Sequence, residues 1–275
     1  MDYTDIQQVG NDVVIRGVKH FDHVTLDCGQ AFRWERVDEF NFVGIAFGRR
    51  MELELKQGDL ALRDTSLAEF ETTWRTYFDF NRSYSNLREI FQQHESMKKA
   101  LAYSPGLRLM RQEPWETKIS FILSQNSNIP RIKKMIGLLC QNFGEKLGCG
   151  GYAFPQPTAL IDADLSVIRS GYRAAYIQDA ARRTIAGEFD FAANATTDEL
   201  RRALMQVHGI GPKVADCVLL FGYGKLECFP MDVWMKRVVE KLYPDGLPQE
   251  LQENAGIAQQ FLFHYARSNA GEFVG

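Results

Sequence analysis

The sequence lacks any apolar run of roughly 18 residues or more, the length that a helix needs to cross a membrane. Its first ten residues, MDYTDIQQVG, are too polar for a secretory signal peptide. These two absences predict a protein without membrane contact and with a cytoplasmic location. Low-complexity linkers and internal repeats are also missing.

The chain has few cysteines and a small net charge. The five cysteines are odd in number and widely spaced, which is typical of reduced thiols and not of a disulfide framework. The histidines show no metal-ligand spacing. A net charge of −3 argues against a protein that coats nucleic acid without specificity. A local basic face stays possible, because binding depends on where the charges lie.

The hydrophobic content and the apolar spacing of the sequence predict an α+β fold. Hydrophobic residues make up 45% of the 275 residues, enough for one large domain or two to three small ones. Segments 13–18, 32–34, 42–47 and 51–55 are short and alternating or β-branched and aromatic, so an antiparallel sheet is expected. From Leu67 onward the apolar spacing becomes helical.

The predicted organisation is an N-terminal antiparallel β domain over residues 1–80 and a mainly helical core over 81–275. The core is expected to have two lobes. In one arrangement, the C-terminal helix and part of segment 81–115 pack in a separate helical lobe.

Residues 207–232, VHGIGPKVADCVLLFGYGKLECFPMD, are the most informative stretch. They predict two helices joined by a tight turn, with the whole hairpin at about 200–222 and the first helix reaching Val207. Gly209 and Gly211 supply the permissive backbone of the turn, and Pro212 suits the first position of the next helix. A glycine turn before a helix presents backbone N–H groups to an anion such as a DNA phosphate.

Lys213 follows this turn, and Asp232 lies 19 residues later, before an apolar helix. The positive end of the helix dipole disfavours an ammonium ion at Lys213, so a neutral, nucleophilic amine is one interpretation. The alternative is that Lys213 is a solvated surface residue and Asp232 an N-cap.

These motifs, with those below, resemble the helix-hairpin-helix DNA glycosylases, and among them the 8-oxoguanine DNA glycosylase/AP lyase branch. The resemblance extends from about residue 22 to residue 267. It implies a base excision repair enzyme that flips 8-oxoguanine opposite cytosine out of duplex DNA and excises it through a lysine imine. The abasic site is then nicked by β-elimination. In this family the nucleophile corresponds to Lys213, and Asp232 would stabilise positive charge on the sugar.

The resemblance also implies a base pocket. Segment 27–34, DCGQAFRW, matches the family's segment beside the flipped base. Oxidation at C8 turns guanine N7 into an N–H donor, so a backbone carbonyl at Gly29 would distinguish the lesion. Gln259 would hydrogen-bond the Watson–Crick edge, and Cys217 and Phe263 would sandwich the base. The alternative for Gly29 is a turn glycine between strands, and the alternative for Cys217 and Phe263 is ordinary core packing.

Two further segments match family residues that contact DNA. In SQNSN, between two predicted helices, Asn126 aligns with the asparagine that enters the space left by the flipped nucleotide. Arg131 and Arg173 align with arginines that hydrogen-bond the orphaned cytosine, and Tyr172 with the aromatic wedge that kinks the duplex. The alternatives are that SQNSN is a capped turn, that Arg131 is a surface arginine and that Tyr172 is a core aromatic residue.

No cofactor is expected to be required. The family implies that a monovalent or divalent cation sits at the hairpin, held by the backbone carbonyls of Met205, Val207 and Ile210. A four-cysteine cluster is missing after the hairpin, so no iron–sulfur cluster is expected. The expected partner is double-stranded DNA containing 8-oxoguanine, bound by a monomer in the nucleoid or in a nucleus.

Two other functions remain open at this stage: a glycosylase for other damaged bases, and a non-catalytic helix-hairpin-helix module that only holds DNA. Such a module needs neither Lys213 nor Asp232. The sequence also departs from the family pattern, because SQNSN is not an unbroken asparagine run and Trp234 stands where relatives carry histidine.

Overall fold

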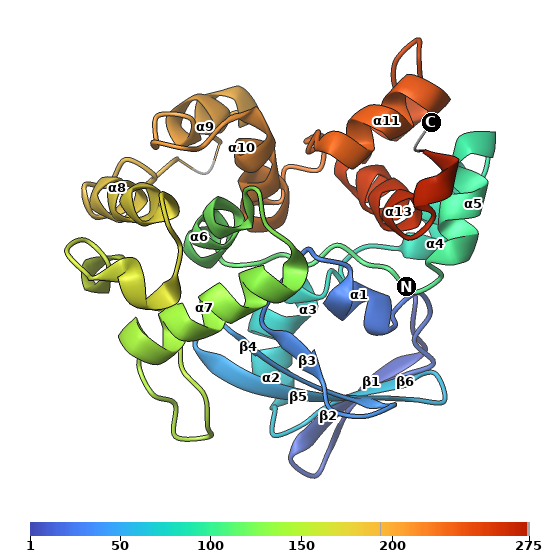
Figure 1. Cartoon of the computed structure of the whole chain (residues 1–275). Coiled ribbons are helices and arrows are strands. Elements are labelled where there is room, and N and C mark those ends of the chain that lie inside the picture. The colour runs from blue at the N-terminus through green and yellow to red at the C-terminus, as the bar shows by residue number, and fades with distance from the viewer. Residues whose placement is uncertain (193, 274–275) are drawn as a thin grey trace.

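The computed structural model describes residues 1–192 and 194–273. An antiparallel sheet forms one end of the molecule, and the helices stand over it in two groups (Figure 1). The predicted α+β fold is confirmed. Within the described residues, no helix is both long and apolar enough to span a membrane.

The sheet has the strand order β1-β2-β6-β5-β4-β3, and all neighbours are antiparallel. Its strands are β1 (Asp5–Val9), β2 (Asp12–Arg16), β3 (Trp34–Arg36), β4 (Asn41–Ala46), β5 (Arg49–Lys56) and β6 (Asp59–Leu62). In β4, alternate residues are buried, and Gly44 leaves room for the ring of Trp34 on the neighbouring strand.

Three features of this region differ from the sequence-based expectation. Strands β1 and β6 were not predicted, because β1 is a mostly exposed, polar edge strand and β6 is only four residues long. Of the expected strand 32–34, only Trp34 is in a strand, since the chain before it leaves a short helix, α1 (His23–Asp27), and turns. Gly29 therefore follows a helix and does not lie between two strands.

A helical segment after the sheet packs against it. It comprises α2 (Leu67–Glu69), a π-helical turn (Phe70–Trp74) and α3 (Arg75–Tyr77). Its aromatic residues form a core with Trp34, whose indole N–H donates to the Tyr77 hydroxyl at 2.8 Å. The helical spacing that begins at Leu67 thus predicted this segment correctly.

The remaining helices fall into two groups (Figure 1). One group contains α6 (Pro114–Ser124), α7 (Ile129–Phe143), α8 (Arg173–Ile185), α9 (Thr197–Leu204) and α10 (Pro212–Val218), which continues as a π-helical turn (Leu219–Tyr223). The other contains α4 (Tyr84–Phe91), α5 (Glu95–Tyr103), α11 (Val233–Leu242), α12 (Gln249–Gln252) and α13 (Ala255–Ser268). Short 3₁₀ turns lie at Pro157–Ala159, Leu165–Ile168 and Ala270–Glu272. The last long helix, α13, packs against α5 and α11, so both ends of the helical region meet in the second group.

The buried side chain of Gln30 fixes the turn after α1. Its amide nitrogen donates to the carbonyls of Thr25 and Arg108 at 2.8 and 2.7 Å, and its amide oxygen accepts from the backbone N–H of Met110 at 2.9 Å. Because these partners lie on two separate segments, the turn that carries Gly29 is held firmly where the sheet meets the helices.

Candidate active site

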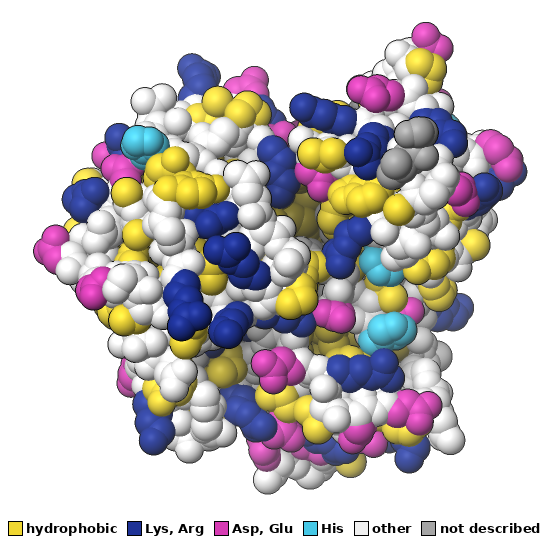
Figure 2. All heavy atoms as spheres, in the orientation of Figure 1, with side chains coloured by type: hydrophobic (Ala, Val, Ile, Leu, Met, Phe, Trp, Pro, Cys, Tyr) yellow, Lys and Arg dark blue, Asp and Glu magenta, His cyan; other side chains and the backbone are white. Residues whose placement is uncertain are grey.

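A cavity of about 420 Å³ opens between the two groups of helices. Figure 2 shows this hollow from outside. Its walls come from the turn after α1, the loop between α6 and α7, the helix α10, the start of α11, and α13. Segments from nearly the whole chain therefore meet at one place, where polar groups stand among apolar side chains, as is usual for a ligand site.

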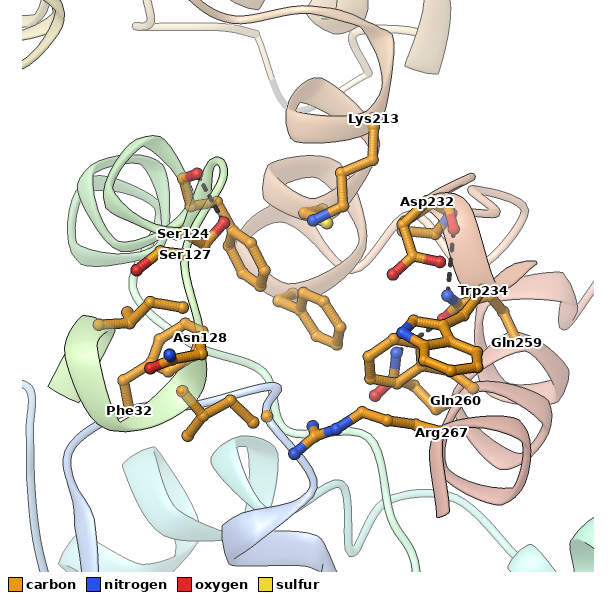
Figure 3. Close-up of a pocket in the computed structure, with 18 of the residues that line it drawn as sticks. Phe32, Ser124, Ser127, Asn128, Lys213, Asp232, Trp234, Gln259, Gln260 and Arg267 are labelled. Atoms are coloured by element: carbon orange, nitrogen blue, oxygen red, sulfur yellow. Dashed lines mark hydrogen bonds between the residues drawn. The ribbon is translucent and has the colours of Figure 1, made fainter. Parts of the chain in front are cut away.

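Lys213 enters this cavity from the first turn of α10. The turn before it is tight, since Gly209 has φ +84° and a Cβ there would lie 2.1 Å from the ring of Tyr176. Gly211 is the N-cap residue of α10, with open space beside it, and Pro212 begins the helix. The half-buried Lys213 points its amine into the cavity, 5.2 Å from the ring centre of Phe121 (Figure 3). Lys213 thus lies in the wall of the cavity and not on the outer surface of the protein.

Asp232 faces Lys213 from the other wall (Figure 3). It is also the N-cap of α11, because its Oδ1 accepts from the backbone N–H of Met235 at 2.8 Å. The two interpretations of this residue are therefore compatible, since capping fixes the carboxylate at the cavity wall. In the part of the chain that the structure describes, no ion pair joins Asp232 to Lys213.

The four predicted base-pocket residues line the same cavity. Gly29 has φ +93°, a conformation that side chains rarely adopt, and a Cβ would lie 2.8 Å from Ile129 Cδ1. Gln259 is 3% exposed, donates to the carbonyl of Pro230 at 3.1 Å and accepts from Gln260 at 2.6 Å.

Cys217 and Phe263 lie on α10 and α13 at opposite sides of the site. Burial raises the pKa of the Cys217 thiol above its ordinary value, against the opposing effect of the nearby Lys213 amine. A thiol in this state is neutral and behaves as a small apolar surface.

The residues expected to contact the rest of the duplex lie outside the cavity. Asn126 has φ +46°, and its amide donates to the hydroxyl of Tyr172 at 3.2 Å. Tyr172 is 50% exposed, as a wedge requires. Arg173, in contrast, is 3% exposed and donates to the carbonyls of Gln125 and Ser170 at 3.0 and 3.1 Å. Asn126, Tyr172 and Arg173 thus form one cluster.

Arg131 lies apart from that cluster, exposed in the first turn of α7. It lines a second, smaller pocket with the basic residues Lys134 and Arg169. This gives the molecule a local positive surface despite its negative net charge.

The hairpin differs from its predicted form in one respect. Helix α9 ends at Leu204 and not at Val207, so Met205, Val207 and Ile210 all belong to the turn. The backbone N–H of Ile210 donates to the Val207 carbonyl at 3.0 Å. Within the described residues, no three His, Cys, Asp or Glu side chains are grouped as for a metal, but that does not address a site made of carbonyls. The cation stays a prediction.

Sequence reasoning did not single out several residues of the cavity wall: Phe121, Ile129, Gln260 and Arg267. One signal was available for Arg267. Gln259, Phe263 and Arg267 are spaced four apart, which places them on one face of a helix.

Two known domain families match this chain. Residues 20–117 match the family described as 8-oxoguanine DNA glycosylase, N-terminal domain. Residues 119–255 match the HhH-GPD superfamily of base excision DNA repair proteins. Together they include strands β3 to β6, the hairpin and both residues that face each other across the cavity.

Individual relatives agree with this. The chain is 31% identical over 257 residues to an N-glycosylase/DNA lyase of Saccharomyces cerevisiae, covering 79% of this chain and 67% of the relative. It is 27% identical over 273 residues to an N-glycosylase/DNA lyase of Arabidopsis thaliana, covering 92% and 73%.

Among solved structures, the 8-oxoguanine glycosylase/lyase of Clostridium acetobutylicum, bound to double-stranded DNA with cytosine opposite 8-oxoguanine, is 33% identical with a TM-score of 0.90. The match covers 98% of this chain and 100% of that one. MBOgg1, bound to a low-affinity DNA ligand, is 37% identical with a TM-score of 0.90 and the same coverage. This chain therefore belongs to the 8-oxoguanine DNA glycosylase/lyase family, within the HhH-GPD superfamily of base excision repair proteins.

Proposed function

We propose that this protein excises 8-oxoguanine opposite cytosine from duplex DNA and then nicks the strand at the abasic site. The observation that carries the proposal is the placement of Lys213 and Asp232 on facing walls of a cavity of about 420 Å³ (Figure 3). Ligand cavities of this order hold small organic molecules, and a nucleobase flipped out of the duplex is one. A module that only holds DNA needs no such cavity.

The chemistry follows from these two side chains. The Lys213 amine, in its neutral form, attacks the sugar C1′ as the bond from C1′ to the base breaks and its electron pair leaves with the base. The Asp232 carboxylate stabilises the positive charge that develops on the sugar. Loss of the amine proton and opening of the sugar ring give an imine. Removal of a C2′ proton then expels the 3′ phosphate, which nicks the strand.

The other walls of the cavity would recognise the damaged base. The Gly29 carbonyl would accept the N7–H that only the oxidised base carries. Gln259 would hydrogen-bond the Watson–Crick edge, and the neutral Cys217 thiol and the Phe263 ring would enclose the two faces of the base. Gln259 must exchange its present bonds to Pro230 and Gln260 for bonds to the base.

Outside the cavity, Asn126 and Tyr172 would fill and wedge the gap in the duplex, and Arg131 and Arg173 would hydrogen-bond the orphaned cytosine. The hairpin glycines Gly209 and Gly211 would let the backbone approach a phosphate, with the carbonyls of Met205, Val207 and Ile210 holding a cation that bridges to it. A monomer suffices for all of this, because one chain supplies every wall of the cavity.

The test is base release and strand nicking on three duplexes that differ only at one position: 8-oxoguanine opposite cytosine, guanine opposite cytosine, and a preformed abasic site. We expect release and nicking on the first, neither on the second, and nicking alone on the third. Release of an alkylated base in preference to 8-oxoguanine would contradict the proposal.

A further inference from the structure

Arg267 places a permanent positive charge beside Gly29. The arginine lies on α13, and its Nη1 is 3.5 Å from the position that a Cβ on Gly29 would take. This exposed residue lines the cavity, and in Figure 3 its side chain extends along the lower wall. Over residues 1–192 and 194–273, the guanidinium makes no hydrogen bond or ion pair with another side chain or carbonyl. Its N–H donors are therefore available to a molecule in the cavity.

The chemistry of the lesion provides a matching acceptor. Oxidation of guanine changes two adjacent positions on one edge of the ring: N7 gains a hydrogen, and C8 gains a carbonyl oxygen. An acceptor that binds N7–H must therefore lie next to whatever faces the C8 oxygen. Gly29 supplies that acceptor in the proposed function, and the neighbouring donor is the guanidinium of Arg267.

We propose that Arg267 is a specificity-determining residue that donates a hydrogen bond to the C8 carbonyl of the flipped base. The inference rests on the proposed function, because it assumes that 8-oxoguanine occupies the cavity. Arg267 also acts against the undamaged base. Guanine has only a C–H at this position, so it offers the guanidinium no acceptor there.

The test compares 8-oxoguanine with 8-thioguanine, each placed opposite cytosine. The thio base keeps the N7 hydrogen but carries sulfur, a weaker acceptor, in place of the C8 oxygen. The natural protein should excise the oxo base faster. Arg267→Met, which keeps an apolar side chain of similar length, should reduce this preference by about tenfold, the loss expected for one hydrogen bond from a charged donor. Arg267→Lys should retain part of it.

A matched control is Arg49→Met, which removes an exposed arginine from the sheet, away from the cavity. It should leave the oxo-to-thio ratio unchanged. Nicking of a preformed abasic site shows that each variant is folded, and it should be retained by Arg267→Met because no base is present.

Two results would overturn the inference in different ways. If Arg267→Met slows both bases equally and weakens binding to abasic DNA with a reduced salt dependence, Arg267 contacts a phosphate and not the base. If the natural protein releases neither modified base, the proposed function itself fails, and the inference fails with it.

Discussion

The cavity and the cluster of Asn126, Tyr172 and Arg173 differ in how their polar groups are satisfied. In the cavity, Lys213 and Asp232 face open space (Figure 3). In the cluster, Asn126 hydrogen-bonds Tyr172, and the buried Arg173 binds backbone carbonyls of its own protein. In the proposed function, Lys213 and Asp232 are thus preorganised, whereas the cluster would have to exchange internal hydrogen bonds for bonds to DNA. Chemistry and recognition of the opposite strand should respond differently to substitution.

The largest expected effect is at Asp232. Asp232→Asn removes the charge but keeps a good N-cap for α11, so stability should hardly change. Base release should fall by about 10²- to 10³-fold, the usual loss when a charge-stabilising group is removed from an active site. Single-turnover excision and thermal unfolding measure the two effects. Asp232→Ser, which also caps, is the control, and equal activity of Asp232→Asn and the natural protein would contradict the assigned role.

Gly29→Ala should have the next largest effect. The added Cβ would lie 2.8 Å from Ile129 Cδ1, in a backbone conformation of φ +93° that alanine adopts only with strain. Distortion of this turn should reduce excision of 8-oxoguanine by roughly tenfold or more, since an error of about 1 Å in a positioned group is costly. Nicking of a preformed abasic site should persist. Gly48→Ala, at a positive φ with open space around it, controls for backbone strain alone.

Arg173 and Arg131, which are both proposed to hydrogen-bond the orphaned cytosine, give a matched pair of substitutions. Arg173→Gln leaves buried carbonyls without donors and should lower the free energy of unfolding by about 1–3 kcal/mol. Arg131→Gln removes an exposed side chain and should leave stability unchanged. Both should reduce the preference for cytosine over adenine opposite the lesion. Denaturant unfolding and excision rates measure these effects, and equal stability of the two variants would contradict the buried role of Arg173.

The smallest effect on activity is expected at Lys118, which is buried between α6 and α8. Its amine donates to Thr184 Oγ1 at 3.2 Å, and burial lowers its pKa to about 7. Because the unfolded chain holds this proton up to a higher pH, the free energy of unfolding should rise with pH above about 7. Lys118→Met should abolish that rise while excision stays nearly unchanged. A persisting slope would show that another group causes it.

Local sequence patterns predicted the fold, and they placed Lys213 at the start of one helix and Asp232 just before another. Alternating and helical spacings gave the main strands and helices, and the glycine turn located Lys213 because its neighbours in sequence determine its position. The ends of elements were less predictable. Helix α9 stops at Leu204, and the π-helical turns at Phe70–Trp74 and Leu219–Tyr223 have no distinct spacing.

Contacts between distant segments could not be predicted in this way. Arg173 turns inward because the carbonyl of Gln125, 48 residues earlier, accepts from it. Arg267 reaches Gly29 from the last long helix, and only the packing of α13 beside the turn after α1 brings them together. These contacts depend on tertiary structure, which local spacing does not encode.

Borohydride trapping with peptide mapping tests the central claim most directly, because it captures the imine on the residue that forms it. The natural protein and Lys213→Gln would each be incubated with a duplex carrying 8-oxoguanine opposite cytosine. We predict a covalent adduct on the peptide that contains Lys213, and none with Lys213→Gln. An adduct on another lysine, or base release by the natural protein without any adduct, would contradict this account.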